Sequence, residues 1–391
     1  MPSASARSAV GWDSDPAVEA VSFPRLDGDV TADACVVGLG GSGLAAIGEL
    51  LRRGLSVVGL DGGKVAAGAA GRNGGFLLAG PASAVHRAAA AWGTAYALEL
   101  YRETLDELDA LEAALGPDVI RRVGSIRLAG PPGPAADDGE RDDRTAEFAD
   151  CQEQYEFLRS HAIAVERYEG ALGSGIFLPD DAAMNPVRRA RGLAAIHGRR
   201  SRLYEHSPVT AISSGQVVTA HGSVSTGVVI VAVDGGLELI LPELTGRVRT
   251  GRLQMLATAP VEADRLPCPV YARWGYDYAQ QDRSGRVFVG GGRDRFVEQE
   301  WTTDTAPTPP VQNWIGRLAE RFVGGPVEVT HRWAASVGYT PDGRPLVTEA
   351  RPGVLACGGY CGTGNLVGPV AARAAVALAL DATPPRPYFA G

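Results

Sequence analysis

A glycine-rich turn near the N-terminus constrains the fold of this chain more than any other feature. The turn, Gly38-Leu39-Gly40-Gly41-Ser42-Gly43, has the spacing G-x-G-x-x-G. It follows the apolar run 34–37 and precedes a helical pattern that stops at Gly54. A second apolar run, 56–60, ends at Asp61. Strand, turn, helix and strand in this order predict a parallel βαβ unit with a right-handed crossover.

The residues of this turn suit the binding of a dinucleotide. Gly38 permits the tight turn, Gly40 lets the backbone approach a pyrophosphate at the helix N-terminus, and Gly43 lets the helix lie close to the strand. Asp61 follows Gly43 by 18 residues, and its carboxylate can accept hydrogen bonds from ribose hydroxyls. The alternative is a glycine-rich loop without a ligand, but an acid at this distance favours dinucleotide binding.

Two more glycine-rich stretches extend the prediction to a flavin. Residues 68–76 (GAAGRNGGF) directly follow the ribose acid, and small residues there let the backbone lie against a flat or phosphorylated group. Residues 358–364 (GGYCGTG) open an Ala-rich helical pattern. The N-terminus of that helix can direct its partial positive charge at an electron-accepting ring. Ordinary flexible loops are the alternative for both stretches.

Composition excludes several classes of partner. The 37 basic and 45 acidic residues give a formal net charge of −8, which argues against binding to nucleic acid or to an anionic membrane. No apolar run is long enough to span a bilayer, and the N-terminal residues do not read as a secretory signal. The five cysteines are scattered, and the six histidines fall in no metal-ligand spacing. We expect a soluble cytoplasmic protein that binds a small-molecule substrate and no metal, nucleic acid or membrane.

Length and pattern predict two domains and an α/β (α+β) fold. We expect a Rossmann-like, discontinuous FAD-binding domain from residues 30–90, 160–240 and 325–385. An inserted substrate domain with an antiparallel sheet is expected from residues 91–159 and 241–324. Strand-like runs alternate with turns over 247–297, which supports that sheet. The Pro/Gly/Asp-rich stretch 131–143 is expected to be a solvated loop.

Several motifs, in the same order, resemble the D-amino-acid oxidase/glycine oxidase superfamily of FAD-dependent amine oxidoreductases. Within it, the chain is most similar to the gamma-glutamylputrescine oxidase-like members. The resemblance spans about residues 33–380, nearly the whole chain. Its motifs are the turn at 38–43 with Asp61, GRNGGF at 71–76, Asn185-Pro186 with Arg191-Gly192-Leu193-Ala194, YEHSPV at 204–209, Trp333 with YTPDGRP at 339–345, and the stretch 358–364.

The resemblance implies how FAD would be bound. The pyrophosphate is expected at Gly38, Gly40, Ser42 and Gly43, and the adenosine ribose at Asp61 and Gly62. Arg72, Asn73, Gly74 and Gly75 would run beside the pyrophosphate and the flavin edge, and the backbone of Val209 would contact the adenine. The pyrimidine side of the isoalloxazine would face Gly359, Gly362, Thr363, Gly364 and Asn365, where backbone dipoles suit the negative charge of the reduced ring.

Two departures from the family pattern concern the flavin chemistry. Sarcosine-oxidase-like members bond the flavin through a cysteine, and the matching stretch 333–339 contains none, so non-covalent FAD is expected. Cys357 and Cys361 are interpreted as small packing residues. Oxygen-using members often place a lysine above the flavin, and the matching strand holds Phe288 instead. The single lysine, Lys64, is expected at the adenosine end, so slow reoxidation by oxygen is predicted.

The substrate side is less defined. Trp274, Tyr276 and Tyr278 alternate along an expected strand, so that one face could cover the flavin; a place in the core or on the sheet surface is the alternative. Arg293 follows three glycines and could bind a substrate carboxylate as a bidentate fork. It is one of 36 arginines, which weakens the signal. No catalytic acid or base is identified.

The expected reaction is the oxidation of an amine or amino acid. Hydride would pass from the carbon beside the nitrogen to flavin N5, leaving an imine, with oxygen as the electron acceptor. One alternative is a flavin dehydrogenase or biosynthetic desaturase, acting on an amine or 2-hydroxy acid, that uses another electron acceptor. The other alternative is a non-catalytic flavin-binding protein, against which the complete glycine motifs at both ends of the cofactor argue.

Overall fold

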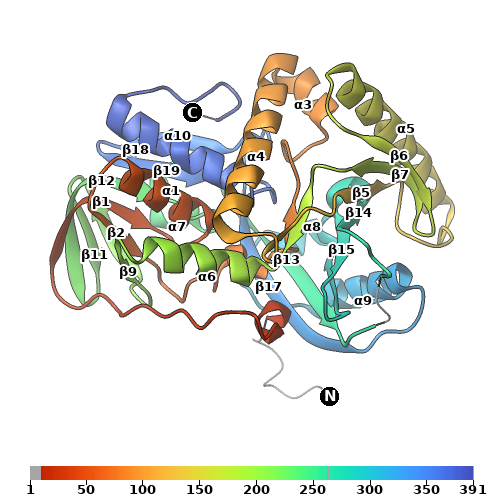
Figure 1. Cartoon of the computed structure of the whole chain (residues 1–391), viewed down its shortest axis with the longest axis horizontal. Coiled ribbons are helices and arrows are strands. Elements are labelled where there is room, and N and C mark those ends of the chain that lie inside the picture. The colour runs from red at the N-terminus through yellow and green to blue at the C-terminus, as the bar shows by residue number, and fades with distance from the viewer. Residues whose placement is uncertain (1–9, 262–263, 391) are drawn as a thin grey trace.

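The computed structural model describes residues 10–261 and 264–390, which form three β-sheets covered by helices (Figure 1). The α-helices are α1 Gly41–Arg52, α2 Ala69–Arg72, α3 Val85–Trp92, α4 Thr94–Leu115, α5 Asp138–Ser160, α6 Pro186–His197, α7 Leu237–Ile240, α8 Val297–Glu300, α9 Pro309–Val323 and α10 Val367–Asp381. The strands are β1 Val30–Val37, β2 Val57–Leu60, β3 Phe76–Leu77, β4 Ile120–Arg121, β5 Ser125–Leu128, β6 Glu166–Gly170, β7 Gly173–Leu178, β8 Ala182–Met184, β9 Arg202–Tyr204, β10 Val209–Ser213, β11 Gln216–Thr219, β12 Gly222–Val231, β13 Arg249–Thr258, β14 Val270–Ala272, β15 Asp277–Gln281, β16 Val287–Gly291, β17 Val329–Tyr339, β18 Leu346–Arg351 and β19 Val354–Gly358.

The first sheet contains the predicted βαβ unit. β1 pairs in parallel with β2 on one side and with β12 on the other, and α1 connects β1 to β2. β9 and β19 extend the parallel core, and β18 and the β10–β11 hairpin add antiparallel strands. β2 and β19 are buried along their whole length, as parallel strands covered on both faces are. Helices α1 and α10 pack against each other beside this sheet (Figure 1).

The second sheet has the strand order β17-β13-β16-β15-β14-β5-β7-β6 and is antiparallel except where β14 meets β5. Helix α9 packs on β13 and β16 of this sheet. The predicted α/β fold with an antiparallel second sheet is therefore confirmed. Strands β6, β7 and β17 belong to this sheet, although the sequence analysis expected their residues in the FAD-binding domain. The third sheet, β3-β8-β4, is small.

The expectation of a loop over 131–143 is wrong in its C-terminal part. Helix α5 begins at Asp138, because the carboxylate of Asp137 accepts a hydrogen bond from the backbone N–H of Glu140 at 2.8 Å and caps the helix. Glu140 then pairs with Arg321 of α9 and with Arg144. The charged run therefore has partners in the fold.

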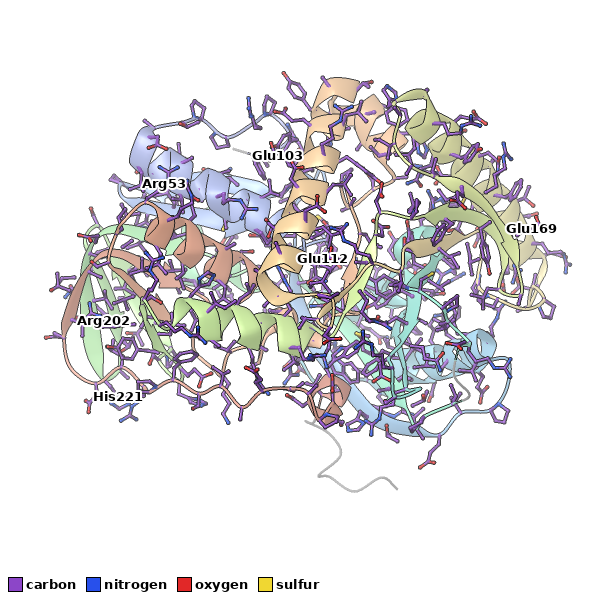
Figure 2. The ribbon with its side chains drawn as sticks, in the orientation of Figure 1. Arg53, Glu103, Glu112, Glu169, Arg202 and His221 are labelled. Atoms are coloured by element: carbon purple, nitrogen blue, oxygen red, sulfur yellow. The ribbon has the colours of Figure 1, made fainter. Side chains whose placement is uncertain are left out.

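Many charged side chains lie on the outside of the molecule, although some, such as Arg127 and Glu300, are buried in ion pairs. Glu169, Arg202 and His221 are exposed on strands and turns at its edges (Figure 2). Among the helices of the described ranges, none has the length and apolar character needed to cross a bilayer.

Candidate functional site

The first glycine-rich turn has no room for side chains at two of its glycines. Gly38 has a φ of +100°, and a Cβ there would lie 2.7 Å from the carbonyl oxygen of Ala232. A Cβ on Gly43 would lie 1.8 Å from the carbonyl oxygen of Gly38. Gly40 caps α1 and carries no side chain that could occupy the first-turn N–H groups. Those donors, together with the helix dipole, suit a pyrophosphate.

Ser42 and Asp61 flank this turn. Ser42 is buried towards α10, where a Cβ on Gly368 would lie 2.5 Å from Ser42 Oγ. Asp61 directly follows β2, and its two carboxylate oxygens accept hydrogen bonds from the N–H of Leu39 and of Gly63, both at 2.8 Å. Burial raises the pKa of Asp61. Each oxygen keeps lone-pair capacity for a ribose hydroxyl.

Gly62 and Val209 complete the expected adenosine end. A Cβ on Gly62 would lie 3.6 Å from Pro208, so this glycine borders the turn that leads into β10. Val209 is the first residue of β10. Ser207 N donates a hydrogen bond to the carbonyl oxygen of Asp61, so the turn before β10 lies next to Asp61. Gly62 and Val209 are therefore close to Asp61.

The segment 72–75 is held by its own side chains. Asn73 Nδ2 donates to the carbonyl oxygens of Ala69 and Ala70, and Asn73 Oδ1 accepts from Gly75 N at 2.8 Å. Arg72 donates to the carbonyl oxygen of Ala334 at 3.0 Å, and its buried Nε has no partner among the described residues. Burial lowers the pKa of Arg72.

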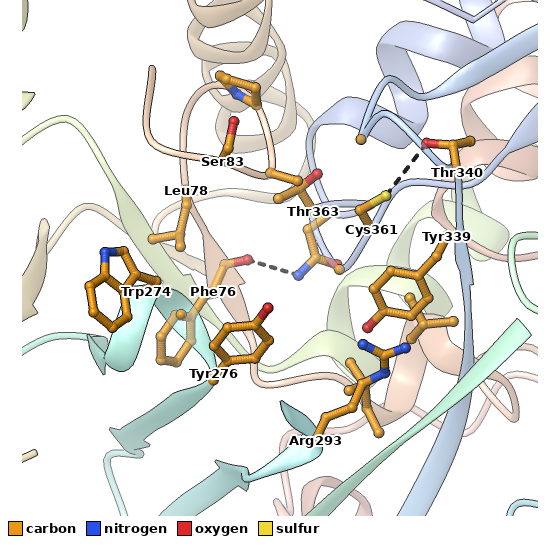
Figure 3. Close-up of a pocket in the computed structure, with 18 of the residues that line it drawn as sticks. Phe76, Leu78, Ser83, Trp274, Tyr276, Arg293, Tyr339, Thr340, Cys361 and Thr363 are labelled. Carbon is orange, nitrogen blue, oxygen red and sulfur yellow. Dashed lines mark hydrogen bonds between the residues drawn. The ribbon is translucent and has the colours of Figure 1, made fainter. Parts of the chain in front are cut away.

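The last glycine-rich turn meets this segment. Asn365 Nδ2 donates to Asn73 Oδ1 at 3.0 Å. It also donates to the carbonyl oxygen of Phe76 at 2.8 Å, the contact drawn as a dashed line from Phe76 in Figure 3. Gly359 and Gly362 have φ values of +67° and +96°. A Cβ on Gly364 would lie 2.9 Å from the Tyr360 ring, so the space beside Gly364 is filled by this chain's own ring.

Asp234, which no sequence motif indicated, forms hydrogen bonds with the last glycine-rich turn and with the end of β17. Its carboxylate accepts hydrogen bonds from Gly338 N and Tyr360 N, each at 3.0 Å. Burial raises the pKa of this carboxyl group to about 6. Asp234 follows β12 and joins the end of β17 to the turn after β19, a contact that no local sequence pattern could indicate.

A cavity of about 1210 Å³ brings the expected flavin residues and the candidate substrate residues together. Arg72, Asn73, Gly74, Gly362, Thr363 and Asn365 line it, as do Trp274, Tyr276, Tyr278 and Arg293 (Figure 3). Gly75, Gly359 and Gly364 are close in the sequence to residues that line the cavity, but they do not line it themselves. The cavity is also not lined by the first glycine-rich turn, nor by Asp61, Gly62 or Val209.

The expected aromatic strand does not form. β14 ends at Ala272 and β15 begins at Asp277, with a tight turn between them. Arg273 and Trp274 have φ values of +51° and +55° in this turn, and the carboxylate of Glu147 accepts their backbone N–H groups at 2.9 and 2.7 Å. The local apolar pattern could not predict this turn, because Glu147 comes from the distant helix α5. Trp274 and Tyr276 nevertheless both line the cavity.

Arg293 lies between two aromatic rings at the cavity wall. Its Cζ is 4.0 Å from the ring centroid of Trp301 and 4.1 Å from that of Tyr339. Its Nε and Nη2 are buried and have no hydrogen-bond partner among the described residues. Arg249, not identified from sequence, stacks on the same Trp301 at 4.2 Å and also lines the cavity. This end of the cavity therefore favours an anionic group.

One other cluster of titratable groups consists of His86, Asp150 and Glu153. Asp150 already pairs with Arg87 and Arg127, and these neighbours lower the pKa of its carboxyl group against the effect of burial. Two guanidinium groups beside the central carboxylate make this cluster a poor place for a cation.

Comparison with known proteins agrees with the geometry. A family model described as FAD dependent oxidoreductase matches residues 33–378. Gamma-glutamylputrescine oxidoreductase from Escherichia coli K12 is 27% identical over 386 residues, which cover 88% of this chain and 82% of that protein. The structure is similar to glycine oxidase from Geobacillus kaustophilus, with a TM-score of 0.71, 19% identity, and coverage of 92% and 98% of the two chains. It is also similar to L-amino acid deaminase from Proteus vulgaris, with a TM-score of 0.72, 16% identity, and coverage of 94% and 99%.

Proposed function

The chain belongs to this family of FAD-dependent oxidoreductases, so FAD is its cofactor, and we propose that it oxidises a small-molecule amine or amino acid that carries a carboxylate. FAD, when bound, supplies the two-electron acceptor for conversion of the amine C–N bond to an imine. The similar proteins are named for an amine or for amino acids, which supports this substrate class. The observation that carries the proposal is the guanidinium of Arg293 at the cavity wall, whose Nε and Nη2 are buried without a hydrogen-bond partner among the described residues.

Arg293 would bind and orient the substrate through its carboxylate. The rings of Trp301 and Tyr339 fix the plane of the guanidinium, so little side-chain freedom is lost when the anion binds. Pairing also relieves the cost of leaving Nε and Nη2 without hydrogen bonds. Trp274 and Tyr278 would form walls that exclude water from the reacting carbon, whereas Tyr276 lines the same cavity but is 43% exposed.

The placement of FAD is part of the same proposal. The pyrophosphate would lie at the N-terminus of α1, the ribose at Asp61 and Gly62, and the adenine beside Val209. The flavin would lie in the large cavity, between segments 72–75 and 359–365. The chain would form the two domains expected from the sequence, one that binds FAD and one that binds the substrate. The start of α1, where no side chain caps the first-turn N–H groups, supports this placement.

FAD would be bound without a covalent link. Burial raises the pKa of Cys361, the one cysteine that lines the cavity among the described residues, so its thiol is protonated and weakly nucleophilic. All five cysteines are free thiols, which supports a cytoplasmic location. Acid precipitation tests the mode of binding: the yellow colour should remain in the supernatant, and flavin in the pellet would contradict it.

Oxygen would reoxidise the flavin in this proposal. A second candidate is an electron carrier other than oxygen, with the chain acting as a dehydrogenase. It is favoured by Phe288, whose ring is 1% exposed and stacks on Trp12, so this position offers no positive charge to stabilise superoxide.

Anaerobic bleaching of the flavin tests the substrate class. Purified holoenzyme is mixed with a panel of amines with and without a carboxylate, and the visible spectrum is followed. Carboxylate-bearing amines should bleach the flavin, and Arg293→Lys should slow this reaction at low substrate concentration. Arg295→Lys, at an exposed neighbouring arginine, is the control. Equal bleaching by amines that lack a carboxylate, unaffected by Arg293→Lys, would contradict the proposal.

A further inference from the structure

Trp12, near the N-terminus, forms a hydrogen bond with segment 72–75, which is proposed to lie beside the flavin. Trp12 lies in the short 3₁₀ turn Gly11–Ser14, is 2% exposed, and its indole Nε1 donates to the carbonyl oxygen of Asn73 at 2.9 Å. A second indole does the same one residue earlier, because Trp333 Nε1 on β17 donates to the carbonyl oxygen of Arg72 at 2.8 Å. Two consecutive carbonyls of this segment are thus held by indoles from opposite ends of the chain.

These two indoles share a third ring. Trp12 stacks on Phe288 with the ring planes 1° apart and the centroids separated by 3.4 Å. Phe288 meets Trp333 edge to face at 6.3 Å. All three rings are at most 2% exposed, so each is held rigidly by its neighbours.

The turn that carries Trp12 is held in place by contacts with residues of α6 and β13 and with the residue that precedes α6. Asn185 Nδ2 donates to the carbonyl oxygen of Trp12 and to Asp15 Oδ2, both at 3.1 Å. Asp13 pairs with Arg191 at 3.0 Å. A Cβ on Gly11 would lie 2.8 Å from Ala257 Cβ, so the turn sits directly on the second sheet. Its position is therefore specified by contacts from α6 and β13.

The indoles also determine where backbone donors point. In a planar trans peptide, the C=O and the following N–H point in opposite directions. Because the Asn73 carbonyl points to Trp12, the Gly74 N–H points away from it. Gly74 lines the large cavity, and within the described chain its N–H donates no hydrogen bond. This donor is left for an acceptor atom of a ligand in the cavity.

Trp12 also borders a second cavity. This cavity, of about 430 Å³, is lined by Trp12, Met184 and Gln280 among others, and it is separate from the large one. A Cβ on Gly75 would lie 3.3 Å from Trp12 Cζ2. The indole therefore contacts segment 72–75 on one side and borders the second cavity on the other. The ring lies behind segment 72–75, where it lines the second cavity.

We propose that Trp12 is a positioning residue of the flavin site, which aims the Gly74 N–H at an acceptor atom of FAD and closes the wall behind segment 72–75. The proposal rests on the placement of this segment beside FAD, proposed above. It makes the N-terminal turn part of cofactor binding, although the turn lies outside the βαβ unit and outside residues 33–378, which match the family.

The test measures FAD affinity of the apoprotein by fluorescence titration, together with the midpoint potential of the bound flavin. Trp12→Phe keeps a ring in the stack and removes the N–H, so the Kd for FAD should rise about tenfold and the potential should become more negative. Trp12→Ala removes both and should raise the Kd by about a hundredfold. Val10→Ala is the control, because it removes a buried side chain from the same N-terminal segment without touching Asn73.

Asn73→Ala separates this proposal from the placement on which it rests. If Asn73→Ala weakens FAD binding and the two Trp12 variants bind FAD as Val10→Ala does, the role of Trp12 is overturned and the placement survives. If none of these variants changes the Kd or the potential, the placement of segment 72–75 fails, and the role of Trp12 with it. A graded loss from Trp12→Phe to Trp12→Ala, beyond that of Val10→Ala, supports the proposal.

Discussion

Asn73 and Asn365 are 292 residues apart in the chain, and the side-chain amide of Asn365 donates to Oδ1 of Asn73 at 3.0 Å. The same amide donates to the carbonyl oxygen of Phe76 at 2.8 Å. Both asparagines line the large cavity, so this contact joins its two glycine-rich walls. This amide therefore links the two walls between which we propose that the flavin lies.

Replacing this amide should loosen the cavity. Asn365→Leu removes the hydrogen bonds to the Phe76 carbonyl and to Asn73 Oδ1, which then keeps only its bond from Gly75 N, so FAD binding should weaken by about 1–3 kcal/mol. Fluorescence titration of the apoprotein with FAD measures the change. Asn313→Leu, at an exposed position of α9, is the control and should leave the affinity unchanged. Equal affinity in both variants would remove Asn365 from the cofactor site.

Asp61 has a structural task besides the one proposed for the ribose. Its carboxylate accepts the N–H of Leu39 in the first glycine-rich turn and the N–H of Gly63. Asp61→Ala should therefore weaken FAD binding by about 1–3 kcal/mol and also lower the melting temperature of the apoprotein. Calorimetry of the apoprotein and FAD titration measure the two effects separately. A variant with lower stability and unchanged FAD affinity would show that Asp61 only holds the turn.

The proposed anion site depends on a glycine beneath it. A Cβ on Gly251 would lie 3.2 Å from Arg293 Nε and 3.2 Å from the Tyr339 ring, so Gly251→Val must displace the guanidinium. We expect KM for a carboxylate-bearing substrate to rise about tenfold or more, with a smaller effect on amines without a carboxylate. Gly316→Ala on α9, where a Cβ would meet open space, is the control. An unchanged KM in Gly251→Val would argue against Arg293 as the anchor.

The parts of the site that depend on local spacing could be predicted from the sequence. The strand, turn, helix and strand around Gly38 and Asp61 are close in the chain, and the βαβ unit forms as expected. The contacts of Trp12 with Asn73 and of Glu147 with Trp274 join distant segments, so no local pattern indicates them. For the same reason the alternation of Trp274, Tyr276 and Tyr278 suggested a strand where a tight turn forms.

Arg293 also shows what could not be predicted from the sequence alone. Its residue type and its glycine-rich surroundings suggested an anion site, but 36 arginines occur in the chain and most of those described have partners. What distinguishes Arg293 is that its guanidinium lies between Trp301 and Tyr339 with Nε and Nη2 buried and without a hydrogen bond, which depends on β17 and on the segment before α9. Only the tertiary structure shows that combination.

Buried carboxyl groups should make the fold less stable at higher pH. Burial raises the pKa of Asp181 to about 7, and Asp181 accepts hydrogen bonds from Ser125 Oγ and Ala79 N. The unfolded pKa is near 3.9, so the stabilisation by the protonated form is complete below about pH 4 and is lost as pH rises through about 7. The free energy of unfolding should fall by roughly 1–3 kcal/mol between pH 5 and pH 8.

Urea denaturation of the apoprotein at pH 5 and pH 8 measures this dependence. Asp181→Asn should reduce the difference between the two pH values, because the amide does not titrate. Asp180→Asn, at the exposed neighbouring carboxylate, should retain the full difference. The same slope in both variants would mean that Asp181 does not titrate in this range.

The reaction of the reduced flavin with oxygen is expected to be slow, and a lysine in place of Phe288 should not accelerate it. Stabilising superoxide requires a positive charge in a dry site next to the flavin. Phe288 does not line the large cavity; its ring is enclosed between Trp12 and Trp333. Phe288→Lys would bury an ammonium in this stack, so we expect a loss of several kcal/mol of stability and no faster reoxidation. Phe288→Leu is the control for loss of the ring alone. Stopped-flow mixing of reduced enzyme with oxygen measures the rate. Fast reoxidation of the wild-type enzyme would mean that another group activates oxygen, and acceleration in a folded Phe288→Lys protein would place this side chain at the flavin after all.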